Sequence, residues 1–246
     1  MQINPKLVKN QFKKSLDKYE ENALVQAIMA DKLIESLGRR EFSSVLELGC
    51  GTGLLTKRLI QSVSYKKYYA NDIVEKSKVY LDKILTDYVF LGGNAQRLQV
   101  NGKFDLIISN AMFQWFSDLE KALLYYQRML NKGGTIAFTT FAPDNFKEIK
   151  SLTGLTLEYK TSEEIQSITE KFFTVKYVEN FDYTLKFTNP LEILAHMKNT
   201  GVNALSTKHW GIKDVKDFCD RYKEEYPDLT LTYSPVVVVA EGRASV

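Results

Sequence analysis

Apolar side chains recur at helical spacing over the first forty residues. One stripe comprises Val8, Phe12, Leu16 and Tyr19, and a second runs over residues 24–37 and stops before Gly38. Intervals of three and four residues place side chains on one face of a helix. The pattern therefore predicts two helices, and we interpret residues 1–40 as a helical cap in front of a sheet.

The next hundred residues alternate between short apolar runs and longer amphipathic segments. Strands are expected at 45–48, 68–73, 88–91, 106–109 and 135–141, with helices starting at 53 and 117 and another around 76–85. Ser117 and Glu120 have the spacing of a capping box. Alternation of this kind favours an α/β fold with a parallel sheet covered on both faces.

The last hundred residues predict further elements. Thr161 and Glu164 form a second capping-box pair, strand-like runs fill 172–187, and Asn189-Pro190 can begin a helix that Gly201 ends. We expect an inserted helical cap at about 189–226 and strands at 229–233 and 235–240. The expected organisation is one domain, 1–246, with an N-terminal cap (1–40), a cofactor half (41–145) and a substrate half (146–246).

Composition narrows the class of protein. The chain has 246 residues, 44% of them hydrophobic, enough for one substantial core. Cys50 and Cys219 have no cysteine or histidine nearby at metal-ligand spacing, so neither a disulfide framework nor a metal site is expected. A net charge of +3, with acids among the lysines, does not favour nucleic acid as a partner. Without an apolar leader or a membrane-spanning stretch, we expect a cytoplasmic protein that contacts no membrane, and a monomer.

The most informative motif is the apolar run 45–48 followed by Gly49-Cys50-Gly51-Thr52-Gly53 and a helix-like segment. Glycines at alternate positions permit backbone conformations that a Cβ would forbid, and they let a ligand lie on main-chain amides near a helix N-terminus. The alternative interpretation is a tight strand-to-helix turn without a ligand.

Four motifs in order resemble the class I S-adenosylmethionine (AdoMet) dependent methyltransferases. They are the glycine loop with Glu47 before it, Asp72 nineteen positions after Gly53, the strand 104–110 and the turn 130–138. A dinucleotide-binding fold would usually show G-x-G-x-x-G. The resemblance implies a Rossmann-like, doubly wound, seven-stranded and mostly parallel sheet, closed by an antiparallel C-terminal strand, with an N-terminal helical cap and an inserted C-terminal helical cap.

The same resemblance assigns roles to individual residues. The cofactor AdoMet would contact Glu47, Gly49, Cys50, Gly51, Gly53, Asp72, Ile73, Asn94, Ala95 and Asn110. The catalytic group beside the reactive methyl would comprise Tyr19, Asn110, Gln114 and Trp115. Many family members carry aspartate where this chain has Asn94, so the contact to the adenine should be weaker. Tyr19 could equally belong to the apolar stripe, and Trp115 could be a core aromatic.

A narrower resemblance covers nearly the whole chain. Residues 9–20, the Ser-Asn-x-x-x-Gln-Trp segment at 109–115, residues 137–141, the cap segment 194–205 and the ending 231–233 are similar to the malonyl-[acyl-carrier protein] O-methyltransferases of biotin synthesis. The resemblance implies methylation of the free carboxylate of malonyl-acyl carrier protein or malonyl-coenzyme A. A carboxylate is already ionised at neutral pH, so no catalytic base is needed.

Several points stay open in the sequence. The cation expected to orient the substrate carboxylate could be Lys160, Lys186, Lys198 or His209. Lys6, Lys9 and Lys13 lie on one side of the first helix, as a docking face for an acidic carrier or simply a solvated face. A methyltransferase of a quinone precursor or a fatty acid, and a non-catalytic AdoMet-binding protein, are the alternatives. The segment after 109 lacks an Asn-Pro-Pro-Tyr motif, which disfavours methylation of nucleic-acid bases.

Overall fold

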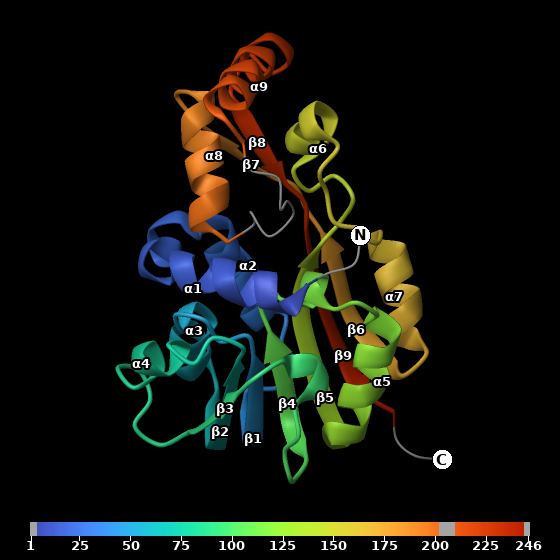
Figure 1. Cartoon of the computed structure of the whole chain (residues 1–246). Coiled ribbons are helices and arrows are strands. Elements are labelled where there is room, and N and C mark those ends of the chain that lie inside the picture. The colour runs from blue at the N-terminus through green and yellow to red at the C-terminus, as the bar shows by residue number, and fades with distance from the viewer. Residues whose placement is uncertain (1–3, 202–209, 244–246) are drawn as a thin grey trace.

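A seven-stranded sheet forms the centre of the computed structural model, which describes residues 4–201 and 210–243 (Figure 1). The strand order is β3-β2-β1-β4-β5-β9-β6. The strands are β1 (Glu41–Leu48), β2 (Ser64–Asp72), β3 (Val89–Gly92), β4 (Phe104–Ser109), β5 (Leu130–Phe141), β6 (Phe173–Asn180) and β9 (Pro235–Gly242). Neighbours from β3 to β5 pair in parallel, whereas β9 is antiparallel to β5 and β6. The expected seven-stranded, mostly parallel sheet is confirmed, as is its antiparallel C-terminal strand.

Alternate side chains of the central strands enter two separate cores, one on each face of the sheet. Val45 of β1 and Leu106 of β4 pack with α2 and α3, whereas Leu46 and Ile107 pack with α5 and α7. Successive side chains of a strand point to opposite faces, so a strand buried on both faces must be apolar throughout. The near-continuous apolar runs in the sequence therefore reflect the doubly wound arrangement.

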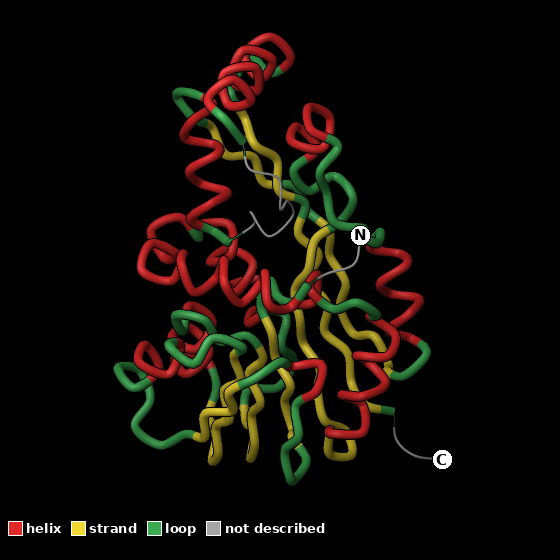
Figure 2. Tube along the Cα trace, viewed as in Figure 1, coloured by secondary structure: helices red, strands yellow, loops and turns green. Residues whose placement is uncertain are grey.

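Helices cover both faces of this sheet and the carboxyl ends of its central strands, as the tube in Figure 2 shows in red. They are α1 (Pro5–Asn22), α2 (Leu24–Glu35), α3 (Leu54–Ser62), α4 (Ser77–Leu81), α5 (Leu119–Met129), α6 (Lys147–Thr153), α7 (Ser162–Glu170), α8 (Pro190–Asn199) and α9 (Ile212–Glu225), with short 3-10 turns η1 (Ala95–Arg97) and η2 (Phe113–Trp115). The helices α1 and α2 lie across the carboxyl ends of β1 and β4 (Figure 1). None of the described helices is long and apolar enough to cross a membrane.

Local capping chemistry accounts for most helix starts. Thr161 and Glu164 form the expected reciprocal capping box, and Asn189 accepts from the amide of Glu192 at the start of α8. The predicted box at Ser117 is wrong by one residue. Asp118, in an extended conformation, accepts from the amide of Lys121 and caps α5, while Ser117 donates to Gln96 instead. The helix expected over 76–85 is shorter, because regular α-helix ends at Leu81.

The C-terminal part carries a second sheet that the sequence did not predict. β7 (Tyr183–Lys186) pairs with β8 (Thr230–Tyr233), and α8 and α9 lie between them in the chain. Strand-like runs were expected at both places, but β8 leaves the central sheet to pair with β7. Val25 and Met29 of α2 share a core with residues of α6, α8, α9 and β8. The N-terminal cap and the C-terminal insertion are therefore packed into one unit, and α6 was not anticipated.

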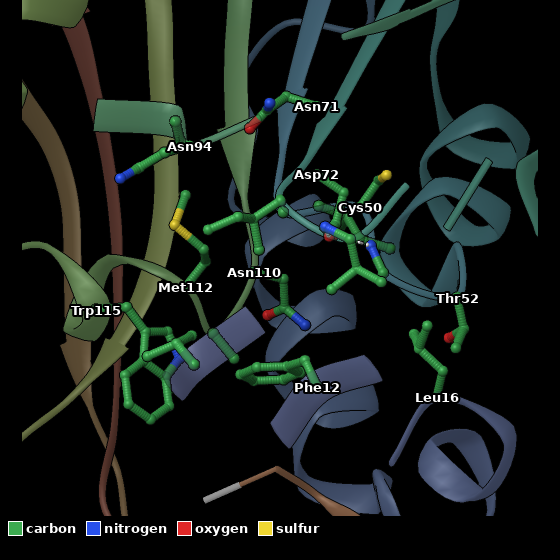
Figure 3. A pocket seen from close by; sticks show the side chains of 18 of the residues that line it. Phe12, Leu16, Cys50, Thr52, Asn71, Asp72, Asn94, Asn110, Met112 and Trp115 are labelled. Atoms are coloured by element: carbon green, nitrogen blue, oxygen red, sulfur yellow. Dashed lines mark hydrogen bonds between the residues drawn. The ribbon is translucent and has the colours of Figure 1, made fainter. Parts of the chain in front are cut away.

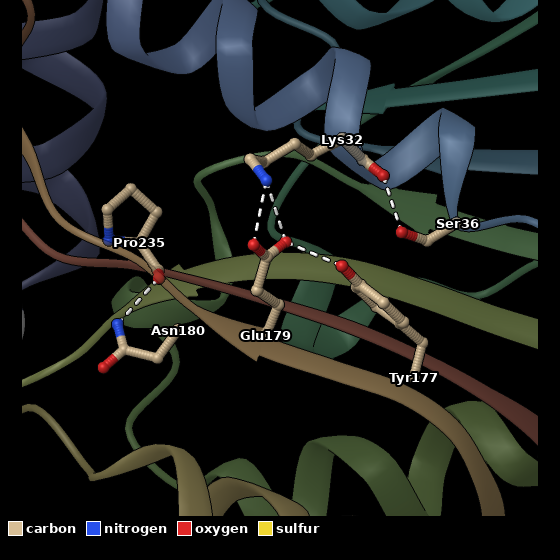
Figure 4. Close-up of polar contacts among 6 residues, drawn as sticks. All are labelled: Lys32, Ser36, Tyr177, Glu179, Asn180 and Pro235. Atoms are coloured by element: carbon tan, nitrogen blue, oxygen red, sulfur yellow. Dashed lines mark hydrogen bonds and ion pairs between the residues drawn. The ribbon is translucent and has the colours of Figure 1, made fainter.

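An ion pair links α2 to the edge strand β6 (Figure 4). Lys32 Nζ lies 2.9 and 3.0 Å from the two carboxylate oxygens of Glu179, and the hydroxyl of Tyr177 donates to the same carboxylate at 2.7 Å. About a third of each side chain of the ion pair is exposed. The Lys32 ammonium also lies 4.7 Å from the centre of the Phe181 ring. The pair holds the cap helix against the far side of the sheet.

We expect a double-mutant cycle of Lys32→Gln and Glu179→Gln to show a coupling of roughly 0.5–1 kcal/mol in the free energy of unfolding. The coupling should shrink in 1 M salt, because the pair is partly exposed to screening ions. Urea unfolding measures it. The more exposed pair between Lys57 and Glu20, which joins α3 to α1, is the matched control and should couple less. Additive effects at the first pair would contradict a link of this kind.

Candidate active site

A cavity opens between the carboxyl ends of β1, β2 and β4 and the helix α1 (Figure 3). Its empty volume is about 1030 Å³ including the mouth. Ligands of open α/β sheets bind at this edge, where the strand order reverses. Of the residues expected to serve the site, it is lined by Tyr19, Gly49, Cys50, Gly51, Asp72, Ile73, Asn94, Ala95, Asn110 and Trp115. The fold thus gathers these positions around one space, which we call the first cavity.

Three glycines shape the loop at the floor of the first cavity, and two of them, Gly49 and Gly51, line it. Gly49, Gly51 and Gly53 have φ angles of +69°, +54° and +83°, which L-residues rarely adopt. A Cβ on Gly53 would lie 2.2 Å from Ile84 Cδ1, and one on Gly49 would lie 2.8 Å from Met112 Cγ. A Cβ on Gly51 would meet no protein atom within 4 Å. Gly51 therefore leaves open a cradle that a side chain would fill, and the other two permit close packing.

The carboxylate of Asp72 connects the turns after β1 and β2. It accepts from the amide of Gly51 at 2.8 Å and from the amide of Val74 at 2.7 Å. Burial raises its pKa, although these two amides oppose the shift. Each carboxylate oxygen has a second acceptor site, so the group can also receive the two hydroxyls of a ribose. The geometry fits the role expected for Asp72.

Asn94 and Ala95 form another wall of the first cavity. The side-chain oxygen of Asn94 accepts from the amide of Gln96 at 2.9 Å and so caps η1. One acceptor site of this oxygen is therefore already used. The amide keeps a second acceptor site and its two N–H donors, which allows an uncharged contact to an adenine edge.

Glu47 lies behind the glycine loop and does not line the first cavity, and the same is true of Gly53. The Glu47 carboxylate accepts from Thr56 at 2.6 Å and from Tyr68 at 2.5 Å. Its other oxygen, Oε1, is buried without a partner among the described residues. Burial raises the pKa of Glu47 to about 7, against the effect of the two hydroxyl donors. In this structure the side chain supports the loop from beneath.

Asn110 ties the cap to the sheet. Its Nδ2 donates to the backbone oxygen of Gln26 in α2 at 2.9 Å, and its Oδ1 accepts from Thr139 of β5 at 2.7 Å. The next residue, Ala111, has a φ of +50°, and its amide donates to the same Thr139 oxygen at 2.8 Å. Backbone conformations of this kind persist where the surroundings impose them and are frequent at active sites.

A second cavity adjoins the first and shares its wall at Phe12, Tyr19, Ala111 and Trp115. Gln114 lines the second cavity and not the first. Asn145 and Tyr159 also line it. No motif in the sequence had singled out these two, because both lie outside regular elements.

His196 lines neither cavity. Its ring is buried, and Nε2 lies 2.7 Å from the Tyr233 hydroxyl. Burial lowers the pKa of His196 to about 4.

Replacing Gly51 by alanine should weaken AdoMet binding at least about tenfold, because the new methyl group would enter the space left for the ligand. The loss of stability should stay near 1–2 kcal/mol, the cost of a left-handed L-residue. Gly53→Ala is the matched control: its Cβ overlaps Ile84, so it should be the more destabilising change. Calorimetric titration and urea unfolding separate the two effects. Wild-type affinity in Gly51→Ala would show that the ligand lies elsewhere.

Glu47→Gln should change how stability depends on pH. An unfolded glutamate has a pKa near 4.3, whereas folded Glu47 has a pKa of about 7, so the folded state binds this proton more tightly. The stability that this proton contributes to the wild type is therefore lost as the pH rises from about 5 to about 8. Relative to wild type, the variant should gain on the order of 2–3 kcal/mol across that window. Urea unfolding of the ligand-free proteins at four pH values measures it. The titration of His196 affects both proteins alike and cancels in the comparison. Parallel plots of stability against pH for the two proteins would exclude a buried Glu47 that binds a proton.

Comparison with known proteins places this site in a known context. The family described as "Methyltransferase domain" matches residues 46–138, which span the glycine loop and β4. The N-methyltransferase NodS from Bradyrhizobium japonicum WM9, solved with S-adenosyl-L-homocysteine, has a similar fold, with a TM-score of 0.58 and 13% identity. The match covers 96% of this chain and 98% of NodS. Likeness at this identity concerns the fold alone.

Similarity in sequence to individual relatives extends over nearly the whole chain. A malonyl-[acyl-carrier protein] O-methyltransferase of Calditerrivibrio nitroreducens is 34% identical over 243 residues, covering 97% of each chain. A protein of the same name from Chlorobium luteolum is 35% identical over 243 residues, covering 94% of this chain and 92% of the relative. Similarity therefore includes the caps as well as the cofactor half. The chain belongs to the family of malonyl-[acyl-carrier protein] O-methyltransferases, within the AdoMet-dependent methyltransferases.

Proposed function

We propose that this protein transfers the methyl group of AdoMet to the free carboxylate of a malonyl thioester, with malonyl-acyl carrier protein as the substrate. The observation that carries the proposal is the similarity to relatives of that name over almost the entire chain, including the C-terminal insertion. Likeness of fold alone would leave the acceptor open, because one fold hosts many reactions. An acceptor other than a malonyl thioester has no comparable support.

The residues around the first cavity fit the cofactor. The amides and open space at Gly51, the carboxylate of Asp72 and the amide of Asn94 would hold AdoMet, with Ile73 and Ala95 as apolar walls. When bound, AdoMet supplies an electrophilic methyl group on a positively charged sulfur. Apolar side chains of α1 line the first cavity and would shield a bound cofactor from water, and Tyr19 lines both cavities at their junction.

The acceptor end needs alignment rather than proton transfer. A malonyl carboxylate has a reference pKa of about 4 and is therefore ionised at neutral pH. No histidine is among the described residues that line the second cavity, so the site contains no obvious general base there. The ties of Asn110 to α2 and β5 hold the shared wall in place. A fixed wall of this kind can orient a nucleophile, which is the main requirement of methyl transfer.

The carrier protein would meet a basic helix beside the cavity. Lys6, Lys9 and Lys13 are exposed on α1, the same helix whose Val8 and Phe12 line the first cavity. Lys9 is close enough to Asp72 for its charge to lower the pKa of Asp72, although burial and hydrogen bonds have larger effects on that pKa. Acyl carrier proteins are acidic, so charge complementarity would favour docking here. We propose that the methyl ester then serves biotin synthesis, by masking the charge of an acyl chain during its elongation.

Purified protein incubated with methyl-labelled AdoMet should transfer label to malonyl-acyl carrier protein, as a base-labile ester. Acetyl-acyl carrier protein, which lacks the free carboxylate, should take up none. Malonyl-coenzyme A should be the poorer substrate if the carrier docks on α1. Label on the malonyl carrier establishes the reaction. The absence of label in protein shown to bind AdoMet would refute the proposed substrate.

A further inference from the structure

The second cavity lies where an acceptor would approach the cofactor. It shares a wall with the first cavity and has an empty volume of about 380 Å³. Beyond that wall it is bounded by Phe141 at the end of β5, by Asn145 in the following loop, by Tyr159, by Thr200 at the end of α8 and by Tyr233 of β8. The C-terminal insertion thus closes the cavity from the side opposite the cofactor.

The polar groups of the second cavity are all uncharged. Tyrosine, glutamine, asparagine, threonine and tryptophan side chains reach it, and none of the described lining residues is a lysine, arginine, histidine, aspartate or glutamate. Of the cations that the sequence suggested for orienting a carboxylate, Lys160, Lys186 and Lys198 are exposed and line neither cavity. His209 lies outside the described residues.

Several of these polar groups lack partners. Trp115 Nε1, Gln114 Oε1 and Gln26 Oε1 are buried and form no hydrogen bond within the described part of the chain. Figure 3 shows the nitrogen-bearing side of the Trp115 indole turned toward Phe12. The two ring planes are perpendicular, and their centroids lie 5.9 Å apart. A ligand that binds this N–H would therefore have to displace the Phe12 ring, but it would not have to break a hydrogen bond. Buried polar groups without partners are uncommon in folded proteins and require an explanation, such as a polar ligand. Of these three atoms only Trp115 Nε1 carries a donor that can bind an anion, because the two glutamine oxygens are acceptors.

Two tyrosine hydroxyls are free to donate into the same space. The Tyr159 oxygen accepts from Asn145 Nδ2 at 3.1 Å, which leaves its proton available. Burial raises the pKa of Tyr159 and of Tyr19, so both stay protonated at neutral pH. Tyr233 lines the second cavity as well, and its hydroxyl lies 2.7 Å from Nε2 of His196.

We propose that the second cavity binds the free carboxylate of the acceptor through uncharged donors, namely the hydroxyls of Tyr19 and Tyr159 and the indole N–H of Trp115. This inference rests on the methyl transfer proposed above and names the residues that select its acceptor. Tyr159 is the new element, because it lines only the second cavity and belongs to no motif of the cofactor half.

Physical chemistry favours neutral donors at this place. A lysine or arginine beside the carboxylate would repel the positive sulfur of the cofactor and would hold the carboxylate charge away from the methyl group. Neutral donors orient the anion without adding a competing positive charge. They also discriminate between substrates: an acetyl group offers no acceptor, so it would leave the buried donors unpaired and would be rejected.

The test replaces Tyr159 by phenylalanine, which removes one donor and keeps the ring. We expect the KM for malonyl-acyl carrier protein to rise roughly 10- to 100-fold, the loss of a hydrogen bond to a charged group. The AdoMet dissociation constant should change less than about twofold, and the inhibition constant of acetyl-acyl carrier protein should not rise, because the deleted hydroxyl can no longer be left unpaired. Tyr222→Phe is the matched control: this buried hydroxyl donates to the backbone of Thr230 and lines neither cavity, so its removal should leave all three values unchanged.

A spectroscopic readout separates this inference from the proposed function. The chain has two tryptophans, and Trp210→Phe assigns the indole N–H signals in protein labelled with nitrogen-15. With S-adenosylhomocysteine bound, malonyl-pantetheine should shift the Trp115 signal downfield and acetyl-pantetheine should not. This shift is expected whether or not methyl transfer to the carrier-bound substrate is detected, so failure of turnover alone would refute only the proposed function.

Three results would overturn the inference while leaving the reaction intact. The first is an equal loss of malonyl and acetyl binding in Tyr159→Phe, which would mean that the residue only shapes the cavity. The second is a Trp115 signal that malonyl-pantetheine does not move. If Lys160→Gln, next to Tyr159, removed the preference for malonyl over acetyl, the uncharged site would likewise be excluded.

Discussion

The carboxylate of Asp72 holds together the two turns from which the first cavity is built. It accepts from the amide of Gly51, after β1, and from the amide of Val74, after β2. The amide of Val74 is buried away from water and requires a protein acceptor, whereas the bond from Gly51 is partly buried at the cavity. The left-handed φ of Gly51 brings its amide to that acceptor. One buried anion thus shapes the loop against which the cofactor is expected to lie.

A second polar junction lies beside the wall that the first cavity shares with the second cavity. Asn110, the residue after β4, accepts a hydrogen bond from Thr139 of β5 and donates one to the backbone of Gln26 in the cap. The turn at Ala111, which borders both cavities, is held by the same Thr139 hydroxyl. Because methyl transfer depends on alignment, a wall fixed by three separate elements serves the reaction better than a mobile loop.

Sequence patterns were reliable where a local rule governs the structure. The apolar runs predicted the strands of the central sheet, and Thr161 and Asn189 marked helix starts. Errors arose where neighbouring residues compete or where pairing is long-range. Asp118 rather than Ser117 caps α5, since both can do so and the backbone conformation decides. Strand-like runs were expected at 172–187 and at 229–233, but the pairing of β7 with β8 was not, because it joins residues about fifty positions apart.

The sequence by itself determined the fold class and the glycine loop, because hydrophobic period and alternating glycines act over a few residues of chain. Only the tertiary structure decided how side chains from distant segments meet. It placed Glu47 behind the loop, bonded to Thr56 and Tyr68. It brought Tyr159 to a cavity with Tyr19, and it left the lysines at positions 160, 186 and 198 outside. Such contacts depend on packing between elements, and no local pattern encodes them.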